Sequence, residues 1–536
     1  MSTSRTVVRT AGLLMGISVF SRLAGFIREQ AIAAQFGTSS ATDAYVVALT
    51  IVNLLYLVLG GALATVFIPL FTQRLADFQG GAGGGSPWRL ASATFNLAAL
   101  TLGLIALLGM LTAPLLVQLV APGFSPETAA LTTRLTRIMF PITLLAAGSM
   151  LVGGLLNALQ HFTLPALSSV VFSLTVTAAV FTFGRSWGIA GLALGTVVAT
   201  LCQVLVQLPA LRGRGVRYHP VLDLGSPDMQ RLLHLMGPVI LGNLVAQAYA
   251  LIERFLASGL STGSISALNF ANRLMLLPFN LFSLAITTAI FPTLSRQAAA
   301  GDHRQLGQTT ALGLRLNGLL TLPAAAGMLA LAGPIVRLVY QRGAFDFQSS
   351  AMTTAALSFY LLGLFALGGF TILSRAFYAL QDTRTPVLIS LLSVAANLTL
   401  GLLLVGPLQH AGLALAAAAA SNLNLLLAWL VLQRRLPGLG ADQLLPPLGR
   451  LLAAALLMAG IVWLGNQGME AALAGLAGGS GHLPLGWQLL QVGTAALAGL
   501  LVYWLLVKWL RADEETRQLV AGWWRERRHK PGTGRS

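Results

Sequence analysis

The chain has 536 residues, of which 56% are hydrophobic and only 9% are charged, with a mean hydropathy of +0.77. Soluble domains carry roughly 25% charged residues, so this composition argues against a soluble enzyme and predicts a surface that faces lipid. The net charge of +17 would suggest nucleic acid in a soluble protein, but here the basic residues gather in a C-terminal tail and in short loops. That distribution is typical of membrane topology, and no nucleic-acid partner is expected.

The sequence contains none of the residue patterns that would indicate a disulfide, a metal site or ATP hydrolysis. Cys202 is the only cysteine and the seven histidines are scattered, so neither a disulfide within the chain nor a metal site is expected. No Walker A pattern for ATP hydrolysis is present either. We therefore predict no catalytic residue and no cofactor.

Apolar runs predict an all-α polytopic membrane protein, since about 20 apolar residues suffice for one spanning helix. About fourteen transmembrane helices are expected, in chain order at approximately 7–36, 43–76, 88–120, 130–160, 163–183, 187–211, 228–257, 265–298, 306–338, 350–380, 385–405, 411–433, 448–466 and 486–510. Ser226 followed by Pro227 predicts a helix that begins with a capping serine and a proline in its first turn.

The loops between these spans fall into two sets. Five of them contain no arginine or lysine: 37–42, 121–129, 258–264, 406–410 and 467–485. Basic loops lie inside, so both termini are predicted to be cytoplasmic, with Arg185 and Arg342 as outside exceptions. Arg134 and Arg137 lie near a span end, where long side chains are expected to reach the interface.

Short sequences recur at nearly one offset along the chain. Asn-Ala-Leu-Gln at 157–160 and Tyr-Ala-Leu-Gln at 378–381 are each followed by proline five residues later. Ala-Gly-Leu-Ala-Leu occurs at 190–194 and again at 411–415, which is the same offset as for the first pair. Phe-Ile-Pro-Leu at 67–70 resembles Ile-Phe-Pro-Thr at 290–293 at an offset that is only two positions longer.

The offset covers six predicted helices, so the two copies enter the membrane in the same direction, as in transporters with parallel repeats. We predict two pseudo-symmetric six-helix lobes plus two C-terminal helices. The N-lobe is 1–217, the C-lobe is 218–436, the last two helices lie in 437–510, and 511–536 is a basic cytoplasmic tail.

Ionisable residues inside spans are costly and point to function. The first span contains Arg22, Arg28 and Glu29, and Asp43 opens the second. Arg22 and Glu29 are seven residues apart and share one face of a helix. Pairing between Arg22 and Glu29 that only satisfies buried charge is the alternative interpretation.

The second half of the chain has its own intramembrane charges. Glu253 and Arg254 lie on the seventh span, Arg273 on the eighth and Arg315 on the ninth. The planar guanidinium of arginine binds phosphate oxygens in a bidentate way, so a cavity rich in arginine would suit an anionic headgroup. Mutual pairing of Glu253 with Arg254 is again the structural alternative.

These charged motifs resemble those of the MurJ (MviN) family, the lipid II flippases of the multidrug/oligosaccharidyl-lipid/polysaccharide exporter superfamily. The resemblance is carried by Ser-Arg-Leu-Ala-Gly-Phe-Ile-Arg-Glu at 21–29, Ala-Thr-Asp-Ala at 41–44, Ala-Asn-Arg-Leu-Met at 271–275 and Ala-Leu-Gln-Asp at 379–382. It covers nearly the whole chain. It implies a V-shaped, two-lobed fold in a bacterial cytoplasmic membrane that alternates between inward-open and outward-open states.

The same resemblance implies roles for individual residues. Arg22, Arg28 and Arg273 match the arginines taken to hold the lipid diphosphate. Glu29 and Asp43 match acids of the family, and we expect both, together with the intramembrane charge of Arg254, to support the cavity. The last two helices would form a groove for the polyprenyl tail.

A coupling ion is a further implication, because some members of the family are thought to bind sodium. Glu253 with Asn397 is the candidate site for Na⁺ in this chain. Two departures from the family pattern, Tyr56 and Gly61, stand where many members have charged residues and predict a less charged cavity.

Together these observations predict a lipid II flippase, not an enzyme, that acts as a monomer among membrane lipids. It would move the undecaprenyl-diphosphate-linked precursor of peptidoglycan from the inner to the outer leaflet by alternating access. The alternatives are a polysaccharide-lipid flippase or a drug/cation antiporter of the same superfamily. An intramembrane polyprenyl-phosphate enzyme is a weaker alternative, because the outside loops are mostly short and poor in acids. An inactive scaffold is another, and it predicts that substitutions that neutralise charge in the cavity are harmless.

Overall fold

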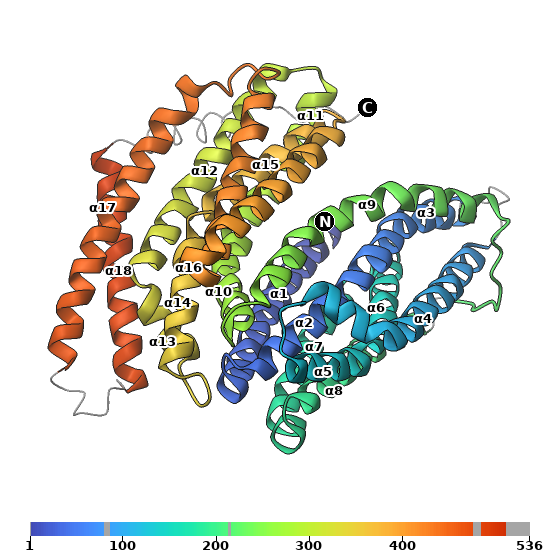
Figure 1. Cartoon of the computed structure of the whole chain (residues 1–536). Coiled ribbons are helices and arrows are strands. Elements are labelled where there is room, and N and C mark those ends of the chain that lie inside the picture. The colour runs from blue at the N-terminus through green and yellow to red at the C-terminus, as the bar shows by residue number, and fades with distance from the viewer. Residues whose placement is uncertain (1, 80–85, 213–215, 475–483, 511–536) are drawn as a thin grey trace. The chain divides into compact units, whose positions relative to one another are not determined.

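The computed structural model describes residues 2–79, 86–212, 216–474 and 484–510, and within these ranges every regular element is a helix (Figure 1). The predicted all-α fold class is therefore confirmed. The basic tail predicted at 511–536 lies outside the described residues.

The helices pack into two compact units. The first unit comprises Met1–Ser266 with Arg342–Ser349, and the second comprises Ala267–Gln341 with Ser350–Ser536. The first contains α1 (Ser2–Phe36), α2 (Ser40–Leu55), the π-helix η1 (Tyr56–Gly60), α3 (Gly61–Gln79), α4 (Pro87–Val120), α5 (Pro126–Met139), α6 (Pro141–Ala158), α7 (Thr163–Phe181), α8 (Phe183–Leu205), the 3₁₀ turn η2 (Leu208–Leu211) and α9 (Pro227–Ala257). The lobe boundaries predicted at 217 and 436 stay predictions.

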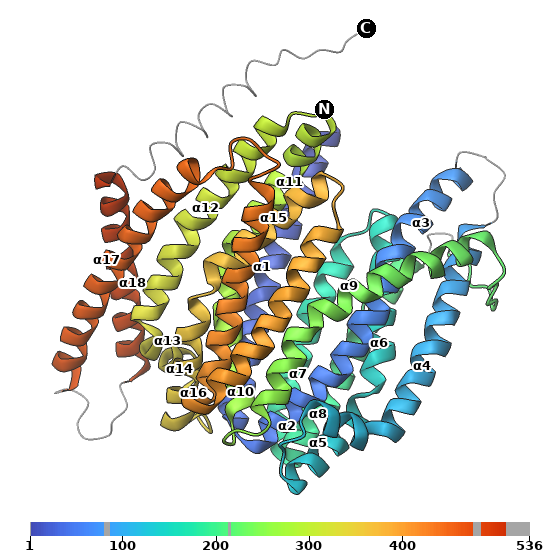
Figure 2. The ribbon, with the colours of Figure 1, turned by 45° about the horizontal axis from the view of Figure 1, so that its top comes forward.

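The second unit holds the remaining helices. These are α10 (Ser264–Pro278, apart from its first turn), the π-helix η3 (Phe279–Ser283), α11 (Leu284–Ala299), α12 (His303–Ala330), α13 (Ala332–Tyr340), α14 (Phe347–Leu361, from Ser350 onward), α15 (Leu364–Ala379), α16 (Arg384–Leu432), α17 (Ala441–Ala474) and α18 (Leu485–Trp509). Within this unit α17 packs against both α12 and α18 (Figure 2).

Helix starts follow the polar residues of the sequence. The Ser226 hydroxyl accepts a hydrogen bond from the N–H of Met229, and Pro227 is the first residue of α9, which confirms the predicted cap. Ser39 caps α2 in the same way through the N–H of Thr42. These side chains satisfy N–H groups that a helix leaves without partners in its first turn.

Eleven helical segments of the described residues are long and apolar enough to cross a membrane, and the bent pair α14 and α15 would make a twelfth. The chain is thus polytopic, but the predicted count of about fourteen is not confirmed. Part of the difference lies in α16, which covers the two predicted spans 385–405 and 411–433, and α1 is not among the eleven.

One face of α4 illustrates the lipid-facing surface. Leu104, Leu107, Leu111, Leu115 and Leu119 recur at spacings of three or four residues, and each is more than half exposed. An exposed apolar stripe of this kind on a spanning helix has lipid as its natural solvent. The opposite face of α4 packs on α5 and α6.

The backbone repeats at the predicted offset. Gln160 and Gln381 both have a positive φ, 59° and 61°. Each glutamine lies in a chain reversal after a helix, called a corner below. In each corner the N–H of the residue after the glutamine donates to a carbonyl five residues earlier, from His161 to Leu156 at 2.8 Å and from Asp382 to Phe377 at 2.9 Å. This is a helix end closed through a left-handed residue. The internal repeat is confirmed.

Two further features support this repeat. The backbone kinks at Gly188 inside α8 and at Gln409 inside α16, with φ of 58° and 50°, and the offset between them is again that of the two glutamines. The two π-helices η1 and η3 are related by the offset of the third sequence match. π-Bulges of this kind are frequent at functional positions within helices.

Candidate substrate-binding site

Arg28 is the most enclosed of the three arginines assigned to the diphosphate. Its side chain is 18% exposed, and its Nη2 lies 2.7 Å from Oε1 of Glu29. The guanidinium also stands over the ring of Phe172 on α7, 5.4 Å from the centroid. A cation over an aromatic face is attracted by the ring quadrupole. Arg28 is therefore oriented by an acid from its own helix and a ring from the neighbouring one.

α7 brings this ring into place by packing along α1. The hydroxyls of Ser21 and Ser169 lie 2.7 Å apart, one turn of α7 before Phe172. Gly25 on α1 faces the Ser173 hydroxyl, where a Cβ would make an ordinary contact at 3.9 Å. Small polar residues at this seam let the two helices approach and hold Phe172 beside Arg28.

The other predicted arginines lie at the surface of their units. Arg22 is exposed on α1 of the first unit, six residues before Arg28. Arg273 is exposed on α10 and belongs to the second unit. A joint site for all three arginines stays a prediction.

Asp43 is buried, with 4% of its surface exposed, and it accepts three hydrogen bonds. Its carboxylate takes the N–H of Gly263, the N–H of Ser266 and the hydroxyl of Ser266, each at 2.7 Å. These bonds tie the start of α2 to the turn that follows α9 and to the first turn of α10. Three donors satisfy a buried carboxylate well, so Asp43 has a defined structural task in the first unit.

Glu253 and Arg254 are ion-paired with each other on α9, and Arg254 is 7% exposed. Asn397 is buried on α16 of the second unit, whereas Glu253 belongs to the first. The positive charge of Arg254 offsets the carboxylate that a cation at Glu253 would use. The candidate sodium site at Glu253 and Asn397 stays a prediction, and the described residues contain no cluster of three or more histidines, cysteines or acids.

An apolar cavity of about 330 Å³ lies in the second unit between α12, α13, α17 and α18. Its lining includes Leu319, Met328, Ile335 and Val462, and Tyr503 is its polar member. The Tyr503 hydroxyl donates to the carbonyl of Leu319 at 3.1 Å. The cavity therefore presents hydrocarbon almost throughout, which suits an apolar chain and not a charged headgroup.

One end of the last two helices is polar instead. Gln491 of α18 donates to Asn466 of α17 at 2.8 Å, and both are buried. Arg337 of α13 pairs with Glu470 of α17 at 2.5 Å. These bonds join three of the helices that border the apolar cavity.

Sequence reasoning found Arg28 and Glu29 but missed Phe172. An aromatic residue in a spanning helix is too common to indicate a partner, and Phe172 lies several helices away from Arg28 along the chain. The three donors to Asp43 were missed for the same reason, because they come from Gly263 in the turn after α9 and from Ser266 in the first turn of α10. Only the assembled helices reveal these contacts.

Comparison with known proteins finds one family over most of the chain. A family model described as "Lipid II flippase MurJ" matches residues 32–475. A protein named "Lipid II flippase MurJ" in Burkholderia cenocepacia is 33% identical over 460 residues, which cover 83% of this chain and 88% of that relative.

Solved structures resemble the chain as well. One described as "Lipid II flippase MurJ, inward closed conformation" has a TM-score of 0.77 at 23% identity and covers 95% of this chain and 99% of its own. An inward-facing multidrug resistance MATE family transporter of the MOP superfamily has a TM-score of 0.68 at 14% identity, covering 80% of this chain and 98% of its own. Both likenesses show a shared fold.

Proposed function

Because this chain belongs to the lipid II flippase MurJ family, whose members are transporters and not enzymes, we propose that it moves lipid II across the bacterial cytoplasmic membrane. The cargo is the undecaprenyl-diphosphate-linked precursor of peptidoglycan. It passes from the inner to the outer leaflet by alternating access. The protein acts as a monomer with both termini in the cytoplasm, in keeping with the arginine-free loops on the opposite side.

The observation that supports a phosphate site best is the setting of Arg28. A guanidinium that is largely enclosed, yet fixed by Glu29 and Phe172, is pre-oriented to receive an anion. Glu29 occupies part of its donor fork, and a diphosphate would compete with that acid for the same cation. In the proposed site Arg22 and Arg273 add positive charge, and Asp43 and Arg254 maintain the frame.

The apolar cavity between α12, α13, α17 and α18 supports a second part of the proposal. It would receive part of the polyprenyl tail while the remainder stays in lipid, since burial of hydrocarbon is favourable in either place. The headgroup and the tail are thus held by different parts of the chain, one charged and one apolar.

Transport in one direction needs a bias between states, because a ligand shifts an equilibrium only through its differential affinity. The membrane potential can supply about 2.3 kcal/mol per charge per 100 mV. The arginines of the proposed site would carry such charge. No step is assigned to sodium, because Arg254 already neutralises Glu253.

The test is growth of bacteria depleted of their own lipid II flippase, with variants expressed at equal and measured levels. Wild type is expected to restore growth. Arg28→Ala is expected to fail, because losing bonds to a charged group lowers affinity by about 10- to 100-fold. Arg28→Lys keeps the charge without the fork and is expected to be intermediate.

Arg185→Ala is the matched control, because Arg185 is also an arginine over a phenylalanine ring, at 5.9 Å from Phe181, but lies exposed on α8. It should restore growth as wild type does. Growth with Arg28→Ala would remove the proposed site and keep the function. If wild type fails and the purified protein also fails to bind lipid II, the proposed function is wrong.

A further inference from the structure

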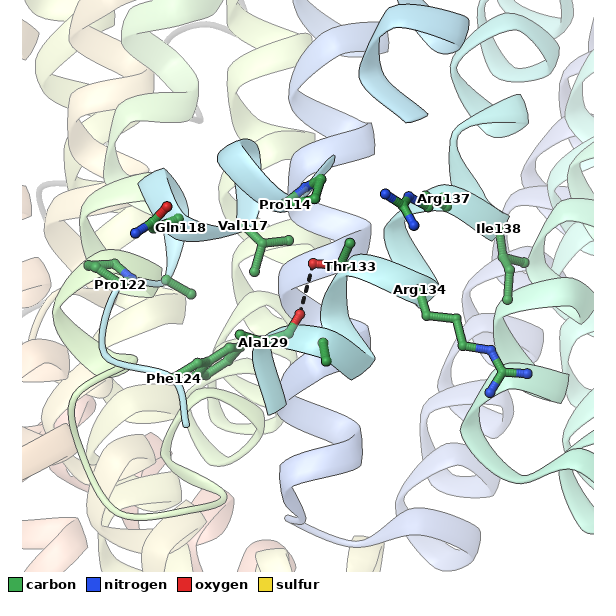
Figure 3. Close-up of a pocket in the computed structure, with 12 residues that line it drawn as sticks. Pro114, Val117, Gln118, Pro122, Phe124, Ala129, Thr133, Arg134, Arg137 and Ile138 are labelled. Carbon is green, nitrogen blue, oxygen red and sulfur yellow. Dashed lines mark hydrogen bonds between the residues drawn. The ribbon is translucent and has the colours of Figure 1, made fainter. Parts of the chain in front are cut away.

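A second basic site lies away from Arg28, in the first unit. A cavity of about 880 Å³ opens between the C-terminal part of α4, the loop that follows it and α5 (Figure 3). Its twelve lining residues include Arg134 and Arg137, and none of the twelve is acidic. Two positive charges in a lining without an acid favour an anionic occupant.

The polar groups of the cavity are held at defined places. The Nε–H of Arg137 donates to the carbonyl of Met110 on α4 at 3.1 Å. Nε is the guanidinium nitrogen that is bonded to the aliphatic part of the side chain. Figure 3 shows this guanidinium turned toward Pro114, with Arg134 extending away from it. The amide of Gln118 and the hydroxyl of Thr133 also line the cavity, and Thr133 donates to the carbonyl of Ala129 at 2.9 Å.

The rim of the same cavity is lipid-facing. Leu111 lies seven residues before Gln118 and therefore on the same face of α4, and it is 68% exposed. Leu115 continues this exposed stripe. An occupant with an anionic head and a hydrocarbon chain could place the head among the arginines and the chain along α4. A free soluble anion would use only the first of these features.

We propose that this cavity is a binding site for an anionic phospholipid. The phosphate contacts Arg137, Arg134 adds positive charge, and one acyl chain packs on Leu111 and Leu115. The loop at 121–129 is free of arginine and lysine and is predicted to lie outside, so the lipid would come from the outer leaflet. In this role the two arginines serve a lipid headgroup in a pocket. The role goes further than the prediction from sequence, in which their side chains only reach the membrane interface.

The experiment measures lipid bound to the purified full-length protein by native mass spectrometry, titrating phosphatidylglycerol against phosphatidylcholine in detergent. Wild type is expected to retain phosphatidylglycerol in preference. The double variant Arg134→Gln/Arg137→Gln should lose about tenfold in apparent affinity for its tightest-bound phosphatidylglycerol. Arg185→Gln removes an exposed arginine from the same predicted side and should change nothing.

A second variant separates a pocket from diffuse surface charge. Ala130→Phe places a ring in the cavity and keeps both arginines, because Ala130 is an exposed lining residue. Loss of the same lipid in Ala130→Phe would support the site. Unchanged binding in Ala130→Phe, or in the double arginine variant, would overturn it. Displacement of the lipid by soluble glycerol phosphate at equal concentration would overturn the role of the acyl chain.

Discussion

The corners that end α6 and α15 share a backbone and differ in their side chains. Each has a glutamine with positive φ and an N–H that returns to a carbonyl five residues earlier. The first ends in His161, whereas the second ends in Asp382, whose carboxylate binds Arg435 and Thr385. The repeat is therefore preserved where the backbone requires it and diverges where side chains make new contacts.

The kinks inside α8 and α16 extend the comparison to a second pair of positions at the same offset. Gly188 and Gln409 hold the same unusual backbone conformation, and a glycine follows each by three residues, Gly191 and Gly412. A Cβ at Gly191 would collide with the carbonyl oxygen of Phe183, and one at Gly412 with that of Leu404. The recurring Ala-Gly-Leu-Ala-Leu sequence therefore has a steric cause, the close return of the chain after each kink.

The largest expected effect comes from filling these close approaches. Gly191→Ala and Gly412→Ala should each destabilise the protein by about 1–3 kcal/mol, because the obstructing atom is backbone and cannot move aside. The measurement is the midpoint of thermal unfolding in detergent. Gly406→Ala is the control, since a Cβ there meets nothing within 4 Å and alanine favours helix. An equal loss of stability in the two variants would show that both kinks depend on the same close approach of the chain. An unchanged unfolding midpoint in either variant would contradict this explanation.

An effect of similar or smaller size is expected from exchanging the kink residues. Gly188→Gln should cost about 1–3 kcal/mol, because a side chain is strained in this region of φ and ψ. Gln409→Gly should raise stability by about 1 kcal/mol, since Gln409 is exposed and a glycine relieves the strain. Opposite shifts in the unfolding midpoint are the expected result. A loss of stability in Gln409→Gly would mean that its side chain is needed.

Much of the fold was predictable because its signals are local. Apolar runs identify the helices, Ser226 with Pro227 marks the start of α9, and the recurring motifs expose the repeat. Span count was harder, because a helix such as α16 continues through a kink that sequence shows only as a break in apolarity. A local sequence pattern predicts that a segment is an apolar helix, but it does not show where one helix continues into the next.

The candidate site was predictable in part. Charge in an apolar span identifies Arg28 and Glu29, since few reasons exist to place an arginine there. What orients Arg28 could not be predicted, because the ring of Phe172 reaches it only when α7 packs on α1. The basic cavity at Arg134 and Arg137 was visible only as a span end, since its other walls come from α4 and the loop after it.

The smallest expected effect concerns Asp382, where the corners differ. Burial opposes ionisation of this carboxyl, but hydrogen bonds from Thr385 and Arg435 outweigh it and lower its pKa from 3.8 to about 2. A carboxyl with a lowered pKa stabilises the folded state above its ordinary pKa, and this contribution is lost as the pH falls toward 2. Asp382→Asn should therefore lower the unfolding midpoint at pH 6 and match wild type more closely near pH 2.

Arg435→Gln and the double variant complete a cycle that isolates the pair from other carboxylates. The coupling should be modest, because the Arg435 side chain is 47% exposed and its charge is screened by water. It should be measurable at pH 6 and disappear below about pH 2, since a protonated Asp382 no longer attracts the guanidinium. A coupling that persists unchanged at low pH would show that packing, and not charge, joins this corner to the end of α16. The second corner would then resemble the first more than its carboxylate suggests.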